Sequence, residues 1–349
     1  MVGEGCALKW GWRVLALGLL IAAVLAAPFA ARTAAVDVKQ RLRPDKPDWE
    51  GVVSVGVVPS FPTVNLSGWL TMAFRKFEAE NSGVLLSLRE ITEIGVRTGA
   101  AACTLPDTLL FGLTVPLEAE QLLQPLPECG SVRSDLQDAG VWGGERCALP
   151  VAMGGYALLG NRRLLDAAGW SPSQDFTGTM TLLAEHGMAI AAPKMPYTDP
   201  LRALAHMGDT VRVQVDGERP HGKVWPDFVI EEKYAFYVAT QREIRRMQAL
   251  GSAGKGFDTI LLVPEGEAYT DQVLLGGVVR PELTGAGREH AEARAQRAEQ
   301  LLRFLLSEEP QRDLTRAGLF PVTDSGPIYA DDGQMAALEQ ALAAGAVLP

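Results

Sequence analysis

The sequence has few residues suited to covalent or metal chemistry. Its four histidines form no His-x-x-x-His pair, and the motifs Gly-x-Ser-x-Gly, Gly-x-x-x-x-Gly-Lys-Ser/Thr and Gly-x-Gly-x-x-Gly are absent. An enzyme needs a nucleophile with its base, a set of metal ligands or a tuned pair of acids, held close together. We therefore expect the chain not to be an enzyme, and we expect no catalytic residue, cofactor or metal site.

Basic residues are also scarce. The chain has 32 lysines and arginines against 42 aspartates and glutamates, which gives a net charge of -10. Binding of nucleic acid needs a basic face, so we expect no nucleic acid partner. The sequence also has no internal repeat and no heptad run, and neither a solenoid nor a coiled coil is expected.

One long apolar run is present, at the N-terminus. Residues 14–31 are apolar apart from the break at Pro28, and they follow Lys9 and Arg13. Positive charge before an apolar run stays on the cytoplasmic side while the run enters the membrane. The run is at the short limit for a spanning helix, which needs about 20 residues.

The end of the apolar run leaves two alternatives open. Residues 33–35 only approach a signal-peptidase site, and no cysteine follows the run as in a bacterial lipoprotein. We predict that residues 1–35 are a cleaved signal peptide or a retained membrane anchor. Residues 36–51, which contain Pro44 and Pro47, are predicted to be a linker. Either alternative places the rest of the chain outside the cytoplasm.

The chain has four cysteines, Cys6, Cys103, Cys129 and Cys147. Cys6 precedes the apolar run, which leaves an odd number beyond it. In an oxidising compartment a disulfide between Cys129 and Cys147 would close the shortest loop. Buried free thiols are the alternative.

The fold is predicted to begin with a βαβ unit. Residues 52–58 are rich in valine, as in a strand buried on both faces. Residues 69–80 carry apolar side chains on one helical face, and residues 84–88 alternate as a second strand. A strand, a helix and a strand at this spacing imply a parallel sheet.

A ligand site is predicted in the loop after the first strand. Ligands of open α/β sheets meet the loops at the carboxyl ends of parallel strands. This loop and the start of the helix contain aromatic faces, a hydroxyl and an amide, which together suit a polar ring. The candidate residues are Ser60, Phe61, Asn65 and Trp69. The alternative for Phe61 and Trp69 is a place in the core.

Further along the chain, Gly154 and Gly155 free the backbone before a predicted strand at 156–159. Residues 209–224 are polar and are predicted to form a surface loop or hairpin. Residues 233–240 alternate as a strand, and residues 242–250 follow as a helix.

Residues 144–169 resemble the crossover segment of extracellular solute-binding proteins of bacterial ABC importers, the family with the maltose- and sugar-binding members. The matching residues are Gly144, Leu149, Pro150, Gly160, Asn161, Leu164, Leu165, Ala168 and Gly169. Residues 77–84 are similar to the family's Phe-Glu-x-x-Asn-Pro-Gly-Val, with Ser82 in place of proline.

The strongest match lies in residues 304–322. The family has Phe-Leu-x-Ser-x-Glu-x-Gln-x-x-Leu-x-x-x-Gly-x-Leu-Pro-Val at this place. This sequence keeps Phe304, Leu305, Ser307, Glu309, Gln311, Leu314, Gly318, Leu319, Pro321 and Val322, with Phe320 as an insertion or substitution. The resemblance covers the chain from residue 52 to the C-terminus.

The resemblance implies an α/β fold of the bilobed periplasmic-binding-protein-like kind (type II), with two α/β lobes joined by a hinge. Lobe I would contain residues 52–153 and 273–325, and lobe II residues 154–272 and 326–349. It also implies further ligand contacts, from Phe111, Tyr156, Tyr197, Thr240 and Arg242. The alternative for each of these is packing or a solvated face.

The resemblance implies an exported receptor at the extracellular face of the cytoplasmic membrane or in the periplasm. It would capture a small solute, with a sugar or oligosaccharide favoured, and deliver it to the permease subunits of an ABC importer. Two alternatives remain open. A membrane-tethered binding or sensor protein without transport is favoured by a blocked cleft, and a secreted enzyme on a bilobed scaffold by a close pair of acids with one raised pKa.

Overall fold

The structure is a computed structural model that describes residues 49–207, 214–285 and 290–349. The predicted signal peptide or anchor, residues 1–35, lies outside the described residues, as do Cys6 and most of the linker 36–51. Among the helices of the described ranges, none combines the length and the apolar character needed to cross a membrane.

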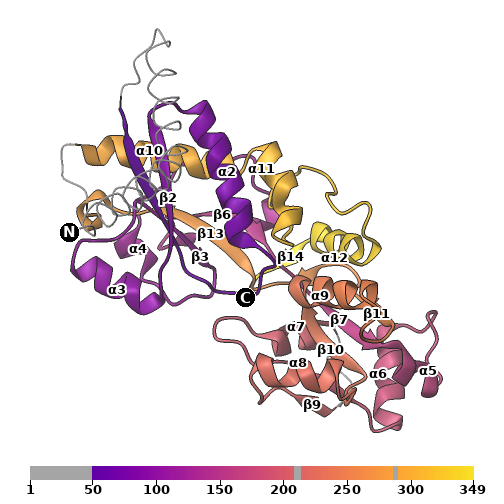
Figure 1. Cartoon of the computed structure of the whole chain (residues 1–349). Helices are drawn as coiled ribbons and strands as arrows, with labels where there is room; N and C mark the ends of the chain where they lie inside the picture. Colours follow the sequence, from indigo (N-terminus) through magenta and orange to yellow (C-terminus); the bar gives the residue numbers. More distant parts are fainter. Residues whose placement is uncertain (1–48, 208–213, 286–289) are drawn as a thin grey trace, which may run out of the picture. The chain divides into compact units, whose positions relative to one another are not determined.

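Two mixed β-sheets organise the chain from Gly51 onward (Figure 1). The first sheet has the order β2-β1-β3-β13-β6. In it β1 runs parallel to β2 and β3, whereas β13 runs antiparallel to β3 and β6. Its strands are β1 (Gly51–Val57), β2 (Val84–Glu90), β3 (Thr108–Gly112), β6 (Leu149–Met153) and β13 (Val273–Val278).

The second sheet has the order β11-β7-β10-β8-β9. In it β7 runs antiparallel to β10 and β11, whereas β8 runs parallel to β10 and β9. Its strands are β7 (Tyr156–Asn161), β8 (Ala189–Ala191), β9 (Gln214–Asp216), β10 (Phe236–Thr240) and β11 (Thr259–Leu262). Two short pairs complete the strands, β4 (Val141–Trp142) with β5 (Glu145–Arg146) and β12 (Ala268–Tyr269) with β14 (Ala346–Val347).

Helices pack around each sheet (Figure 1). With the first sheet go α2 (Leu66–Glu80), α3 (Glu93–Ala101), α4 (Ala119–Leu122), α10 (Ala291–Leu305), α11 (Glu308–Arg312) and the 3-10 turns Ser134–Leu136, Pro281–Leu283 and Asp313–Arg316. With the second go α5 (Arg162–Ala167), α6 (Phe176–Glu185), α7 (Pro200–Met207), α8 (His221–Val229) and α9 (Gln241–Ser252), and the C-terminal α12 (Gly333–Ala344) contacts α9 of this group and β12. We call these two groups lobe I and lobe II, and the residue limits of the lobes given above remain our proposal.

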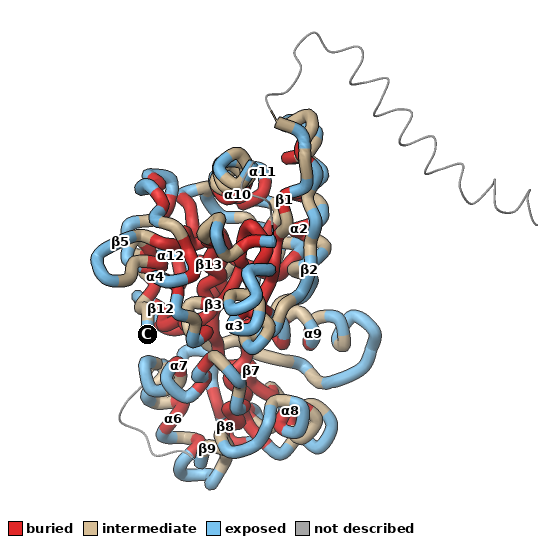
Figure 2. Tube along the Cα trace, turned by 90° about the vertical axis from the view of Figure 1, so that its left-hand side faces the viewer, coloured by how far each residue is buried: buried red, intermediate tan, exposed pale blue. Residues whose placement is uncertain are grey.

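The predicted βαβ unit is confirmed, because β1 pairs in parallel with β2 across α2. Val53 and Val55 of β1 are fully buried, as expected of β-branched residues in an inner strand. Figure 2 shows that β3 and β13 are buried as well, while β2 forms an exposed edge. The bilobed fold class is likewise as predicted.

The chain crosses between the sheets at the Gly154–Gly155 link, which joins β6 to β7. It returns at residues 270–272, which join β12 to β13. Gly154 N donates to Gln272 O at 2.7 Å, and Thr270 Oγ1 donates to Gly154 O at 2.9 Å. These hydrogen bonds fasten the two links to each other, so the crossing is one connected unit that we call the hinge.

One alternative is resolved and one prediction needs correction. Cys103, Cys129 and Cys147 are free thiols, so the alternative of buried free thiols holds for Cys129 and Cys147, and no disulfide joins them. Both cysteines are buried, and burial raises the pKa of the Cys147 thiol. The correction concerns the predicted loop at 209–224. Helix α8 already begins at His221, and residues 208–213 lie outside the described residues.

Candidate functional site

A pocket of about 230 Å³ opens at the carboxyl end of β1, where the chain leaves the first sheet for α2. Leu88 and Glu90 from the end of β2 and Leu274 of β13 contribute to its wall. This edge of a parallel sheet is where α/β folds bind ligands. Its loop contributes the polar residues Ser60, Thr63, Asn65 and Ser67 beside the ring of Phe61.

Three of the predicted site residues, Ser60, Phe61 and Asn65, line this pocket. Ser60 is buried against β3, so closely that a Cβ added to Gly112 would lie 2.5 Å from Ser60 Oγ. Asn65 is exposed, and its Oδ1 accepts a hydrogen bond of 3.0 Å from Gly68 N. Asn65 thereby caps α2, and the loop is held at both ends.

Trp69 does not reach the pocket. It is fully buried, and its indole Nε1 donates to Pro310 O at 2.9 Å. It shares the buried face of α2 with Leu70 and Phe77. Packing covers the ring in this arrangement, so Trp69 has the place in the core that the sequence left open as the alternative.

Phe111 and Thr240 are also buried. Phe111 stacks on Trp142 with ring centroids 6.4 Å apart and is 1% exposed. Thr240 is the N-cap of α9, where Thr240 N donates to Glu243 Oε2 at 3.1 Å and the Thr240 hydroxyl donates to the same carboxylate. Both side chains are occupied by structural contacts in this arrangement.

The N-terminus of α9 nevertheless carries a residue that reaches lobe I. Arg242, the predicted contact, is exposed, whereas its neighbour Gln241 is fully buried. Gln241 Nε2 donates to Pro62 O at 2.8 Å, and Gln241 Oε1 accepts from Gly155 N at 3.1 Å. Pro62 lies between two residues of the pocket, so Gln241 links the pocket loop to the hinge.

Tyr197 makes a second contact between the lobes. Its hydroxyl donates to Glu93 Oε2 at 3.3 Å, and Glu93 also pairs with Arg97 at 2.6 Å. Burial, together with the negative charge of Glu93, raises the pKa of the Tyr197 phenol. Tyr197 therefore stays protonated at neutral pH, and the phenol and the carboxylate together can exchange hydrogen bonds with a polar ligand.

Tyr156 lies inside the hinge rather than on an open surface. It is 1% exposed, and its hydroxyl donates to Asp271 Oδ1 at 2.7 Å. The other carboxylate oxygen, Asp271 Oδ2, accepts from Asp199 N at 2.6 Å. Burial raises the pKa of Asp271 and raises the pKa of Tyr156 well above its usual value.

Several polar residues near the pocket and the hinge were not predicted from the sequence, namely Glu90, Glu93, Gln241, Asp271 and Gln272. Glu90 and Gln241 stand at the carboxyl ends of their strands, a position that could have identified them. For Asp271 and Gln272 the sequence offers no such signal, because their surroundings come from distant segments.

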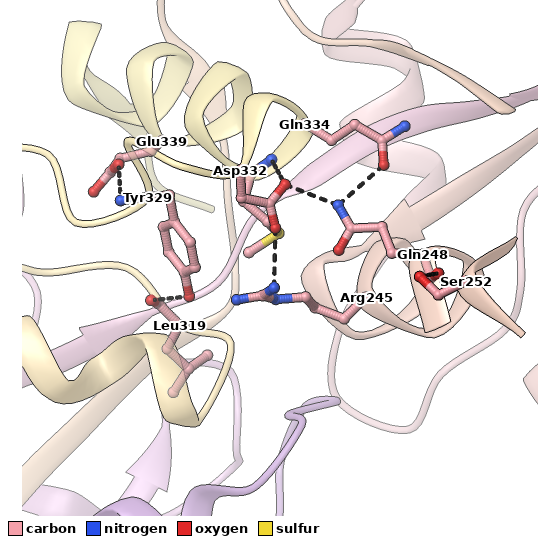
Figure 3. A network of polar contacts seen from close by, with 9 residues as sticks. Arg245, Gln248, Ser252, Leu319, Tyr329, Asp332, Gln334 and Glu339 are labelled. Carbon is pink, nitrogen blue, oxygen red and sulfur yellow. Dashed lines mark hydrogen bonds and ion pairs between the residues drawn. The ribbon is translucent and has the colours of Figure 1, made fainter. Parts of the chain in front are cut away.

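A larger cavity, of about 720 Å³, lies between α9 and the segment that leads into α12. Figure 3 shows Asp332 between Arg245 and Gln248. Asp332 Oδ2 accepts from Arg245 Nη1 at 3.0 Å, and Asp332 Oδ1 accepts from Gln248 Nε2 at 2.8 Å. Asp332 also caps α12. The polar side chains of Asp332, Arg245 and Gln248 are thus hydrogen-bonded to one another. We interpret this cavity as a structural joint that holds the C-terminal segment against α9.

No family model matches the chain, and no curated protein matches it either. Solved structures do match over most of the chain. One is the GacH receptor of Streptomyces glaucescens, studied unliganded and with acarbose, at 15% identity and a TM-score of 0.61, covering 86% of this chain and 88% of that one.

A second is the cyclic alpha-maltosyl-1,6-maltose binding protein of Arthrobacter globiformis, at 16% identity and a TM-score of 0.62, covering 86% of this chain and 88% of that one. A third is the galacto-N-biose/lacto-N-biose I-binding protein of an ABC transporter of Bifidobacterium longum, at 12% identity and a TM-score of 0.61, covering 87% and 88%. The chain therefore has the fold of these bilobed sugar-binding proteins.

Proposed function

We propose that this chain is an exported solute-binding protein that captures a sugar or oligosaccharide between its lobes. The observation that carries the proposal is the pocket at the carboxyl end of β1, where an aromatic ring, hydroxyls, an amide and a carboxylate converge. Sugars are bound by stacking on aromatic faces and by hydrogen bonds that fix their orientation. The shared fold with sugar-binding proteins supports the same solute class.

Within this proposal the predicted residues divide into two groups. Phe61 and Tyr197 are partly exposed and supply the aromatic faces, while Ser60, Asn65 and Arg242 supply polar groups. The buried residues Trp69, Phe111, Tyr156 and Thr240 instead hold the loop, the hinge and α9 in place.

We further propose that the lobes move about the hinge and that the loaded protein delivers its solute to ABC permease subunits. A ligand shifts such an equilibrium only by its differential affinity for the two states. The Gln241–Pro62 and Tyr197–Glu93 hydrogen bonds join the lobes, and their rearrangement would couple binding to movement. The N-terminal segment would keep the protein at the membrane surface.

A second candidate is a membrane-tethered binding or sensor protein without transport. The pocket volume of about 230 Å³ favours it, because ligand sites commonly measure about 300–1,000 Å³. The two candidates share a binding step and differ in whether a permease partner exists. A pull-down with detergent-solubilised permease subunits, with and without sugar, separates them.

The first test is a thermal-shift screen of the purified full-length chain in mild detergent. The panel contains sugars, oligosaccharides, amino acids, polyamines and inorganic anions. A ligand present at 100 times its dissociation constant adds about 2.7 kcal/mol of stability. We expect a sugar to shift the unfolding temperature and to be recovered unchanged. A shift with amino acids or anions alone would contradict the proposed solute class, and a converted sugar would indicate an enzyme.

A further inference from the structure

The hinge contains a fully buried amide that the chain leaves without a partner. Gln272 is 0% exposed, and within the described residues neither Nε2 nor Oε1 of its side chain has a hydrogen-bond partner. Its backbone is satisfied, since Gln272 N donates to Thr270 Oγ1 at 3.1 Å and Gln272 O accepts from Gly154 N. Burying an unpaired amide lowers the stability of the fold, which indicates that the polarity of this side chain serves a function other than stability.

The Gln272 amide converges with that of Gln241 on Gly154. A Cβ added to Gly154 would lie 2.5 Å from Gln272 Oε1 and 2.6 Å from Gln241 Nε2. Only glycine leaves room for both amides at this point. Because Gln241 Nε2 also donates to Pro62 O, Gln241 connects the pocket loop to the place where the Gln272 amide lies.

The other polar groups of the hinge are already engaged. The Tyr156 hydroxyl lies near the Gln272 amide but is directed at Asp271 Oδ1. Asp271 Oδ2 accepts from Asp199 N, and Thr270 Oγ1 donates to Gly154 O. The Gln272 amide is thus the hinge group with both a donor and an acceptor to offer.

We propose that Gln272 is a specificity-determining residue that reads two neighbouring hydroxyls of a bound sugar. The inference rests on the proposed function. The amide NH₂ donates to one hydroxyl and the amide oxygen accepts from the next, which suits hydroxyls because each both donates and accepts. Gln241 releases Pro62 to admit the ligand. When ionised, the buried carboxylate of the adjacent Asp271 disfavours an anion at this place, and within the proposed function the ligand is a neutral sugar ring.

The test uses calorimetric titration of the full-length protein with glucose, galactose, maltose and lactose. Gln272→Met removes the donor and the acceptor while keeping the length of the side chain. Thr108→Val is the matched control, because Thr108 Oγ1 is also buried and unpartnered within the described residues, on β3 of lobe I. Thr108 takes no part in the proposed site.

We expect a sugar that binds the wild type to bind Gln272→Met at least about tenfold more weakly, a difference of about 1.4 kcal/mol. We expect Thr108→Val to bind it as the wild type does. Both variants should unfold at the wild-type temperature or above it, since each loses an unpaired buried polar group.

Deoxy analogues of the bound sugar give the readout that a structural role would not produce. The wild type should lose affinity for the analogue that lacks a hydroxyl read by Gln272, and Gln272→Met should not distinguish that analogue from the parent sugar. If Gln272→Met does not fold, Gln272→Asn carries the same test, because it keeps the amide but withdraws it by one methylene.

Equal affinity of the wild type and Gln272→Met overturns this inference alone and leaves the proposed function intact. An equal loss for the parent sugar and every deoxy analogue also overturns it, because that pattern indicates a general disturbance of the hinge. Failure of all four sugars to bind the wild type overturns both the inference and the sugar-binding function on which it rests.

Discussion

The hydrogen bond between Tyr156 and Asp271 should make the hinge sensitive to pH. Tyr156→Phe removes the hydroxyl that donates to Asp271 Oδ1. The hydrogen bond from Asp199 N to Asp271 Oδ2 remains. Hydrogen bonds to charged groups contribute about 1.5–3 kcal/mol. We therefore expect the free energy of unfolding to fall by about that amount where Asp271 is ionised.

The sign of the pH dependence follows from the pKa of Asp271, which burial raises above its ordinary value of 3.8. A group whose folded-state pKa is raised contributes stability below its unfolded pKa, and this contribution is lost as the pH rises through the folded pKa. The Tyr156 hydroxyl offsets part of that loss by donating to the carboxylate. Its removal should therefore matter most above the folded pKa of Asp271 and least at acid pH, where Asp271 is protonated.

The assay is urea unfolding at about pH 8 and at about pH 3.5, which lies below the ordinary carboxyl pKa and therefore below a raised one. Tyr329→Phe is the matched control, because Tyr329 is also buried and its hydroxyl donates to the neutral Leu319 O at 2.9 Å. The control should lose about 0.5–1.5 kcal/mol, with little dependence on pH. A loss from Tyr156→Phe that is the same at both pH values, or no larger than the control's, would show that the Tyr156 hydroxyl does not stabilise the ionised form of Asp271.

Three further outcomes are expected. Gly112→Ala places a Cβ 2.5 Å from Ser60 Oγ, so it should displace the pocket loop and weaken sugar binding about tenfold by calorimetry; unchanged affinity would remove Ser60 from the site. Trp69→Phe loses the bond to Pro310 O and should lower the free energy of unfolding by about 1–3 kcal/mol without changing sugar affinity, whereas a selective loss of affinity would restore Trp69 as a ligand contact. Asp332→Ala releases Arg245, Gln248 and the cap of α12 and should cost about 1–2 kcal/mol in urea unfolding; no cost would show that the joint does not stabilise the C-terminal segment.

The βαβ start of the fold could be predicted from the sequence because its signals are local. A valine-rich run, a helix with one apolar face and an asparagine cap specify β1 and α2 without reference to the rest of the chain. Helix α8 could not be predicted in this way. It starts at His221 within a polar stretch and contains Pro226, so its helical state depends on burial of Trp225 and Phe228 in lobe II.

The site residues also differ in whether a local sequence signal or a distant contact determines their position. Ser60, Phe61 and Asn65 could be placed from sequence because a loop after a parallel strand meets the ligand edge of the sheet. Trp69 could not be judged, since about half a turn of helix separates an exposed from a buried position and its partner Pro310 is far away in the chain. The roles of Gln241 and Gln272 could not be predicted from sequence, because their side chains come together only where the two links of the hinge meet in the fold.

Sugar binding at the β1 pocket is tested most directly by calorimetric titration of the full-length protein with neutral sugars, beside the Phe61→Ala variant. Phe61 is the partly exposed ring of the pocket. We expect saturable binding of a sugar with one site per chain, and a loss of about tenfold or more in affinity in Phe61→Ala. Saturable binding of an amino acid, polyamine or anion with no response to any sugar would contradict this expectation.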